Sequence, residues 1–167
     1  SATLVIWEDF DVLDKSSNGQ VFSPLRELSD KVQEHISLIF HRYISAKKIS
    51  MWINHAKVQA QDPFLEYPGS KTTIKKVRTI ALRDSQGIER LVEVQPFVLP
   101  FATDLTEKDK KLLGGIENLR TKQGFYIYRN MRLIIWGTWF GLKKSELTKN
   151  ARVRVDIPNS LDDIWGI

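Results

Sequence analysis

The 167-residue chain contains no cysteine. This absence excludes disulfides and thiolate zinc sites, and it favours a reducing compartment, so we expect a cytoplasmic protein. The sequence also has no apolar run near the roughly 18 residues that a membrane-spanning helix needs, so we expect no membrane partner. With 42% hydrophobic residues, the chain can still form a substantial core, as a globular domain does.

The motifs of common catalytic sites are missing as well. There is no G-x-G-x-x-G, no P-loop and no G-x-S-x-G elbow. The three histidines, His35, His41 and His55, lack the spacing of metal ligands, and we interpret them as surface or interface residues. Asp162 and Asp163 are neighbours whose carboxylates diverge, unlike a glycosidase pair. We therefore expect no enzyme activity in this chain, and no catalytic, cofactor-binding or metal-binding residue.

Charge is distributed unevenly. The net charge is +5, but residues 1–14 carry four acids and no base. Residues 120–154 carry nine basic residues against Glu146 alone. Such asymmetry suits a polyanion or an acidic protein surface, although a solvated basic surface is an equally good interpretation.

The remaining patterns predict an α+β fold with a largely antiparallel or mixed sheet and one long helix packed on it. Apolar residues at helical spacing predict a helix over 24–44, begun by Ser23 and Pro24. A short helix over 107–113 follows Thr106, which can cap it. Strands are expected in a buried segment at 2–7, around Asn54 and His55, in a hairpin of 73–84 with 88–99, in a hairpin at 124–136, and at 151–158, followed by a last turn capped by Asn159 or Ser160.

The hairpin at 124–136 allows two interpretations. Phe125, Ile127, Leu133 and Ile135 alternate as core residues do. Arginines and tryptophans nearby also suit a single-stranded nucleic acid, but we prefer the interpretation in which the tryptophans close the core. The candidate interface residues for nucleic acid or a protein partner are Arg129, Asn130, Arg132, Trp139, Lys143, Lys144 and Arg152.

Four stretches in order resemble one family. "ATLVIWEDFD" is similar to the closing strand of the ATPase domain in GHKL-type (gyrase, heat-shock chaperone, histidine kinase and MutL-like) proteins, with Ala2 in place of a glycine. "HISLIFHRYIS…ISMWINHAKVQAQDPF" resembles the start of the next domain in bacterial members, with Asn54-His55 replacing Asn-Gly. "QGFYIYRNMRLI" resembles a stretch shared with Microrchidia proteins, and "ARVRVDIPNSLDDIWGI" resembles the strand and loop after it.

The resemblance implies that residues 1–15 end a preceding ATPase domain and that residues 16–167 form a transducer-like domain. It also implies the β-α-β topology of the second domain of ribosomal protein five. ATP and magnesium would belong to the neighbouring domain of the parent protein, with closure relayed to a possible homodimer. The switch lysine would fall beyond Ile167, so the chain, which begins with Ser1, is expected to be an excised fragment. The alternatives are a nucleic-acid-binding module using the 120–154 surface and a client-handling interaction domain.

Overall fold

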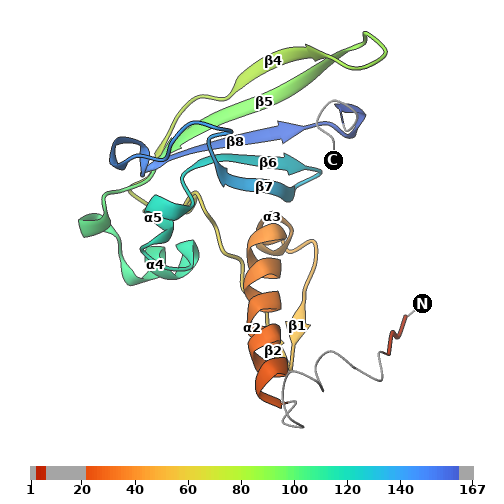
Figure 1. Cartoon of the computed structure of the whole chain (residues 1–167), viewed down its shortest axis with the longest axis vertical. Helices are drawn as coiled ribbons and strands as arrows, with labels where there is room; N and C mark the ends of the chain where they lie inside the picture. The colour runs from red at the N-terminus through yellow and green to blue at the C-terminus, as the bar shows by residue number, and fades with distance from the viewer. Residues whose placement is uncertain (1–2, 7–21, 162–167) are drawn as a thin grey trace.

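The structure, a computed structural model, describes residues 3–6 and 22–161 (Figure 1). The described helices are α2 (Phe22–Ile39), α3 (His41–Ser45), α4 (Glu107–Leu113) and α5 (Asn118–Thr121). The strands are β1 (Trp52–Ile53), β2 (Ala56–Lys57), β3 (Thr73–Ile74), β4 (Arg78–Arg83), β5 (Glu89–Val98), β6 (Gly124–Arg129), β7 (Arg132–Thr138) and β8 (Ala151–Ile157). Short 3-10 turns are η1 (Ala102–Asp104), η2 (Glu146–Thr148) and η3 (Asn159–Leu161).

The main sheet is mixed and six-stranded. β5, β8, β6 and β7 lie side by side in that order, and β3 and β4 both pair with the outer edge of β5 (Figure 1). β8 runs antiparallel to β5 and parallel to β6, so the last strand of the described residues lies in the middle of the sheet. β7 and η2 join the parallel strands β6 and β8, whereas the expected β-α-β topology places a helix between parallel strands.

The hairpins occur where turn chemistry predicts them. β1 and β2 flank Asn54-His55, and β4 and β5 flank a turn that includes Gly87, with a φ of 77°. α4 has the expected bounds because Thr106 and Asp109 form a reciprocal capping box at its start, and Gly114, with a φ of 73°, ends it. These signals act over three or four residues, so they can be identified in the sequence.

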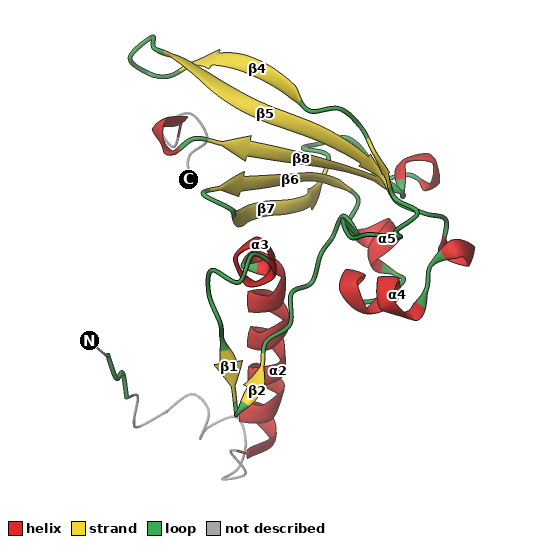
Figure 2. Cartoon of the chain, turned by 180° about the vertical axis from the view of Figure 1, so that it is seen from behind, coloured by secondary structure: helices red, strands yellow, loops and turns green. Residues whose placement is uncertain are grey.

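The helix expected over 24–44 is divided into two. α2 begins at Phe22 and ends at Ile39, and α3 follows after Phe40, whose φ of −103° and ψ of 15° interrupt the helix. Figures 1 and 2 show α2 extending away from the sheet, with α3 at the sheet end. The expected long helix packed on the sheet is therefore replaced by a helix that meets the sheet near its C-terminal end. Leu28 and Val32, on its outer part, remain 49% and 41% exposed.

The two faces of the sheet differ in chemistry. One face carries the cluster of Phe64, Phe97, Tyr126, Tyr128 and Leu133. Helices α2, α3 and α5 lie against this face. The other face, here named the apolar face, carries Ile80, Leu82, Val92, Val94, Phe125, Ile127 and Val155. In the described residues, the buried cluster on the apolar face consists of strand side chains and Leu161 of η3.

The strand expected at 2–7 is described only over residues 3–6. These residues pair with no strand in the described parts of the chain, and Leu4, Val5 and Ile6 are 83%, 70% and 67% exposed. A lone extended segment has no ladder of hydrogen bonds, so it is not a strand here. The acidic stretch 8–14, the loop at 16–20 and the final residues 162–167 lie outside the described residues.

Candidate functional site

The first group of predicted interface residues lies at the tip of the β6–β7 hairpin. Arg129 and Arg132 face each other as the last pair of the ladder, and Asn130 and Met131 form the turn with φ values of 47° and 65°. Tyr43 of α3 donates a hydrogen bond to the Asn130 carbonyl oxygen at 2.5 Å. The Arg132 guanidinium lies 5.5 Å from the centre of the Phe40 ring. The tip is therefore held against α3, beside a groove of about 440 Å³.

Buried polar contacts join α3 to the central strands beneath this tip. The His41 ring bonds to the Tyr128 hydroxyl at 2.7 Å, and Arg42 forms an ion pair with Asp156 of β8. Burial, together with the charges of Arg42 and Arg154, lowers the pKa of His41 to about 3. Burial also raises the pKa of Tyr128 well above its usual range. His41 is thus a neutral core residue, which corrects its interpretation as a surface or interface histidine.

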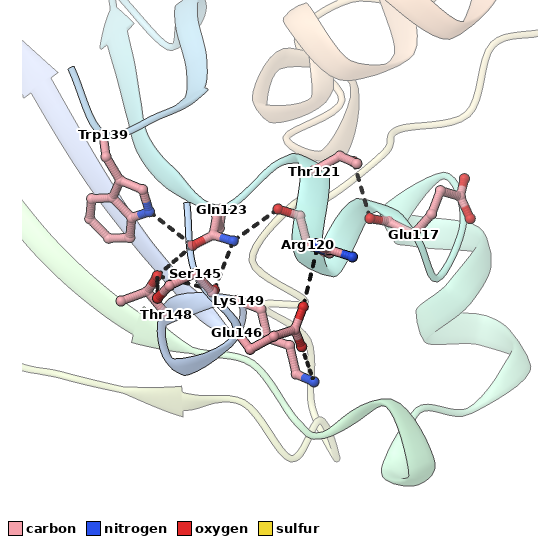
Figure 3. A network of polar contacts seen from close by, with 9 residues as sticks. All are labelled: Glu117, Arg120, Thr121, Gln123, Trp139, Ser145, Glu146, Thr148 and Lys149. Atoms are coloured by element: carbon pink, nitrogen blue, oxygen red, sulfur yellow. Dashed lines mark hydrogen bonds and ion pairs between the residues drawn. The ribbon is translucent and has the colours of Figure 1, made fainter. Parts of the chain in front are cut away.

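The second group lies at the opposite end of β6 and β7, around Gln123 (Figure 3). The Gln123 amide nitrogen donates to the Arg120 and Ser145 carbonyl oxygens at 3.0 and 3.2 Å. Its carbonyl oxygen accepts hydrogen bonds from the Trp139 indole at 3.0 Å and the Thr148 hydroxyl at 2.5 Å. Around it, Glu146 pairs with Arg120 and Lys149 at 3.2 and 2.9 Å. One fully buried amide therefore connects α5, β6 and the loop before β8.

The structure places the remaining predicted residues in different surroundings. Trp139 bonds to Gln123 and packs edge-on against Phe125, so its indole closes the end of the core. Lys143 and Lys144 are exposed, and Lys144 donates to the Thr121 carbonyl oxygen. Arg152, by contrast, is only 1% exposed. Its expected place in an interface is therefore corrected: its side chain lies inside the protein, because backbone carbonyl groups of α5 accept its hydrogen bonds.

The seven candidate residues do not form one surface. Arg129, Asn130 and Arg132 lie at one end of β6 and β7, and Trp139, Lys143, Lys144 and Arg152 lie near the other. A six-residue strand such as β6 separates its ends by about 20 Å. Each group therefore needs its own partner contact.

The apolar face is a candidate docking surface. Its strand residues surround an apolar hollow of about 290 Å³, with Phe140 at the margin. Ile80 and Phe140 remain 46% and 53% exposed there. Exposed apolar patches that are contiguous mark interaction sites more often than isolated apolar residues do. Sequence reasoning identified the alternation that builds this face, but not that Ile80 and Phe140 remain exposed on it while Val92, Ile127 and Val155 are at most 5% exposed.

The sequence analysis also did not identify Gln123 and His41 as buried polar residues. Their hydrogen-bond partners lie from 3 to 87 positions away in the chain, and no local pattern connects such positions. The six-residue spacing of His35 and His41 does predict that the two side chains lie on different helix faces. In the structure, His35 packs beside Trp136, whereas His41 is buried under β6.

Comparisons of the chain with protein-family models, with curated proteins and with solved structures find no match. Among the described residues, no helix has the length and apolar character that crossing a membrane requires. The same residues contain no group of three or more histidine or acidic side chains placed to hold a metal ion.

Proposed function

We propose that the chain is the non-catalytic transducer domain of a GHKL-type ATPase. In this role it relays closure from a neighbouring nucleotide-binding domain to the rest of the parent protein. The proposal rests on the order of four sequence stretches that resemble this family, and on one structural observation. That observation is the apolar face, because a relay domain has to dock against the domain whose movement it transmits.

The exposed side chains support a docking role. Ile80 and Phe140 lie on the apolar face, and at about 25 cal/mol per Å² a docked partner would gain free energy by covering them. The opposite face is already covered over β6 and β7, since Phe64, Leu38 and His41 pack against it there. The apolar face is therefore the side on which we expect the neighbouring domain.

Movement would pass through the centre of the sheet. β8 is bonded on both sides, to β5 and β6, and its Asp156 pairs with Arg42 of α3. A force applied to the apolar face would thus reach α3 and the segment after Ile157 through one rigid strand. We assign no contact with ATP or magnesium to a residue of this chain, and we expect the switch lysine beyond Ile167. The finer β-α-β topology remains part of this proposal.

The parent protein provides the test. Full-length protein should bind ATP, and Ile80→Asp should lower its ATPase rate while leaving the isolated transducer region folded. Leu91→Asp is the matched control, because Leu91 is 60% exposed on the same strand pair but on the opposite face. A parent sequence without nucleotide-binding motifs, or equal rates for the two variants, would reject the proposal.

One observation favours the alternative of a nucleic-acid-binding module. Lys143 and Lys144 are exposed in the loop that also exposes Phe140, which gives a base-stacking ring beside two cations. Fluorescence titration of a labelled oligonucleotide at two salt concentrations tests it. Binding that weakens steeply with salt and disappears in a Lys143→Gln, Lys144→Gln double variant would support this function, and absence of binding at low salt would remove it.

A further inference from the structure

The groove at the tip of the β6–β7 hairpin combines apolar walls with positive charge. Its volume is about 440 Å³, and it lies between the tip, α3 and the segment that leads to β1. The apolar lining consists of Phe40, Tyr43, Ile49 and Met51, and the polar lining consists of Arg129, Asn130 and Arg132. These described lining residues include no carboxylate. The relay role assigned to β8 and the apolar face does not use this groove.

Arg132 has no anionic partner in the described part of the chain. Its side chain is exposed, and its guanidinium lies 5.5 Å from the centre of the Phe40 ring. It forms no ion pair and no hydrogen bond with a described residue. A guanidinium that packs on an aromatic ring keeps its planar set of N–H donors, which matches the two oxygens of a carboxylate. Arg132 is therefore placed at the groove with its donors unused.

Two more polar side chains at the tip have a weak partner or none among the described residues. The Lys48 ammonium donates to the Met131 Sδ at 3.3 Å, and a thioether is a weak acceptor. The Asn130 side-chain amide is exposed and makes no hydrogen bond to a described residue, whereas its main-chain carbonyl oxygen is held by Tyr43. The turn is thus fixed in place, while no described carboxylate neutralises Arg132 or Lys48.

The aromatic rings distinguish a peptide from a nucleic acid as the occupant. Phe40 and Tyr43 are half-buried, and their ring planes are tilted by 58° with centres 6.3 Å apart. Arg132 lies over the Phe40 ring, so this ring does not present an open face on which a base could stack. Ile49 and Met51 add a half-buried aliphatic wall. The groove therefore suits an apolar side chain better than a stacked base.

We propose that this groove binds an acidic peptide segment of a partner protein. A carboxylate of the segment contacts Arg132, with Lys48 adding positive charge at the same tip, and a neighbouring apolar side chain packs on Ile49 and Met51. The charge-assisted hydrogen bonds are stronger than neutral ones, and the apolar side chain gains free energy in proportion to the area that it buries. A groove of about 440 Å³ has the size of a ligand pocket, so the partner contributes a short segment.

Three labelled peptides of equal length test this proposal by fluorescence anisotropy with the 167-residue chain. One alternates glutamate with leucine, one alternates glutamine with leucine, and one alternates glutamate with serine. We expect the glutamate–leucine peptide to bind at least about tenfold more tightly than the others, because each of those lacks one of the two contacts. Equal binding of the glutamate–serine peptide would indicate general attraction to a basic protein and would overturn the proposal. Equal binding of the glutamine–leucine peptide would overturn it too.

Variants locate the binding at the tip. Arg132→Gln should weaken binding of the glutamate–leucine peptide about tenfold, as expected for the loss of a charge-assisted contact. Arg132→Lys keeps the charge without the planar donors and should weaken it less. Lys143→Gln removes the same charge from an exposed loop and should leave the affinity unchanged. Equal affinity of Arg132→Gln and Lys143→Gln for the peptide would contradict the assigned contact.

A single-stranded oligonucleotide serves as the competing probe. At about 0.15 M salt, where general attraction is screened, it should not displace the bound peptide. Displacement would assign the tip to a nucleic acid and would overturn the peptide proposal. These measurements involve no nucleotide hydrolysis, so their result and that of the ATPase assay are independent.

Discussion

Gln123 shows how much a single buried side chain contributes to this structure. Its amide makes four hydrogen bonds, to the Arg120 and Ser145 carbonyl oxygens and from Trp139 and Thr148. A buried polar group is favourable only when its bonding capacity is filled, and here it is filled by three separate elements. The amide therefore fixes the loop that carries Lys143 and Lys144.

The first prediction concerns this amide. Gln123→Ala removes all four hydrogen bonds of the buried amide, including the one that the Trp139 indole donates, so we expect a loss of about 3 kcal/mol in the free energy of unfolding. Urea unfolding followed by tryptophan fluorescence measures it. Gln86→Ala, at an exposed turn position, is the control and should change stability by less than about 0.5 kcal/mol. Equal losses in the two variants would contradict the role assigned to Gln123.

The second prediction concerns His41 and pH. The pKa of His41 is about 3 in the folded protein against a usual value of 6.5. Between these two pH values the His41 side chain is protonated in the unfolded chain but not in the folded protein. The stability that neutral His41 contributes is therefore fully present above pH 6.5 and is lost as the pH falls toward 3. The slope contributed by this one group is at most about 1.4 kcal/mol per pH unit.

Burial raises the pKa of Asp62, which acts in the opposite direction above its usual value of 3.8. The contribution of His41 is therefore obtained by subtracting the stability of His41→Gln from that of the wild type at each pH. Urea unfolding of wild type and His41→Gln between pH 4 and 7 should show the wild type losing more stability toward acid. Gln86→Ala, which removes no titratable group, should keep the wild-type pH dependence. Parallel pH profiles for wild type and His41→Gln would show that His41 does not titrate as proposed.

At the scale of the elements, the two-residue hairpin turns have one common feature. Asn54-His55 and Asn130-Met131 have positive φ at both positions, the geometry of a type I′ turn. Asparagine tolerates that region, but His55 and Met131 occupy it at φ values of 67° and 65°. The second position of each turn is where glycine would relieve strain.

The third prediction follows from that strain. His55→Gly should raise the free energy of unfolding by about 0.5–1 kcal/mol, because the relief of left-handed strain exceeds the added freedom of the unfolded chain. Gly87→Ala is the reverse test. Its φ is 77° and an added Cβ meets no atom within 4 Å, so it should lose about 1 kcal/mol through backbone strain alone. Chemical denaturation that gives both changes the same sign would contradict the argument.

Which elements could be predicted from the sequence depends on the range of the signal. The α4 capping box and the hairpins are local patterns, and they appear as expected. The alternation of β8 correctly separates Val153, Val155 and Ile157 from Arg152, Arg154 and Asp156. It does not reveal that helices and loops pack over the charged face as well. Arg154 bonds to Glu66 and Arg152 to Asn118, 88 and 34 positions away, and periodicity contains no information about such partners.

The candidate site was only partly predictable for the same reason. The exposed positions of Lys143 and Lys144 follow from a polar loop, whereas the burial of Arg152 depends on carbonyl groups of α5. The groove at the hairpin tip needs α3 and the 49–51 segment to be brought beside β6 and β7, and no motif marks it. No proline or glycine lies in 25–44, so the sequence contains no local signal for the division of the helix at Phe40. In the structure, α2 and α3 both contact β7.

At the scale of the whole molecule, stability is expected to be uneven. β8 is paired on both sides, and Arg152, Val155 and Ile157 along it are at most 5% exposed. α2 extends away from the sheet (Figures 1 and 2), with Leu25, Leu28 and Val32 exposed by 37–49%. An element with few buried apolar contacts opens at a lower free energy than the global unfolding reaction.

The last prediction measures this gradient by hydrogen exchange. In the isolated chain, the amides of residues 26–34 in α2 should exchange at least about 100-fold faster than those of β8, because opening the outer part of α2 exposes little that is not already exposed. Leu28→Ser should change global stability by less than about 0.5 kcal/mol, whereas Ile39→Ser, at 6% exposure in the same helix, should cost about 3 kcal/mol. Equal protection of α2 and β8 would mean that the outer helix is stabilised as strongly as the sheet. If α2 becomes protected in the parent protein that we propose, the exposed stripe of Leu25, Leu28 and Val32 would be a second surface covered by the proposed neighbouring domain. In that case the relay would act on both α2 and the apolar face, which β8 and α3 connect.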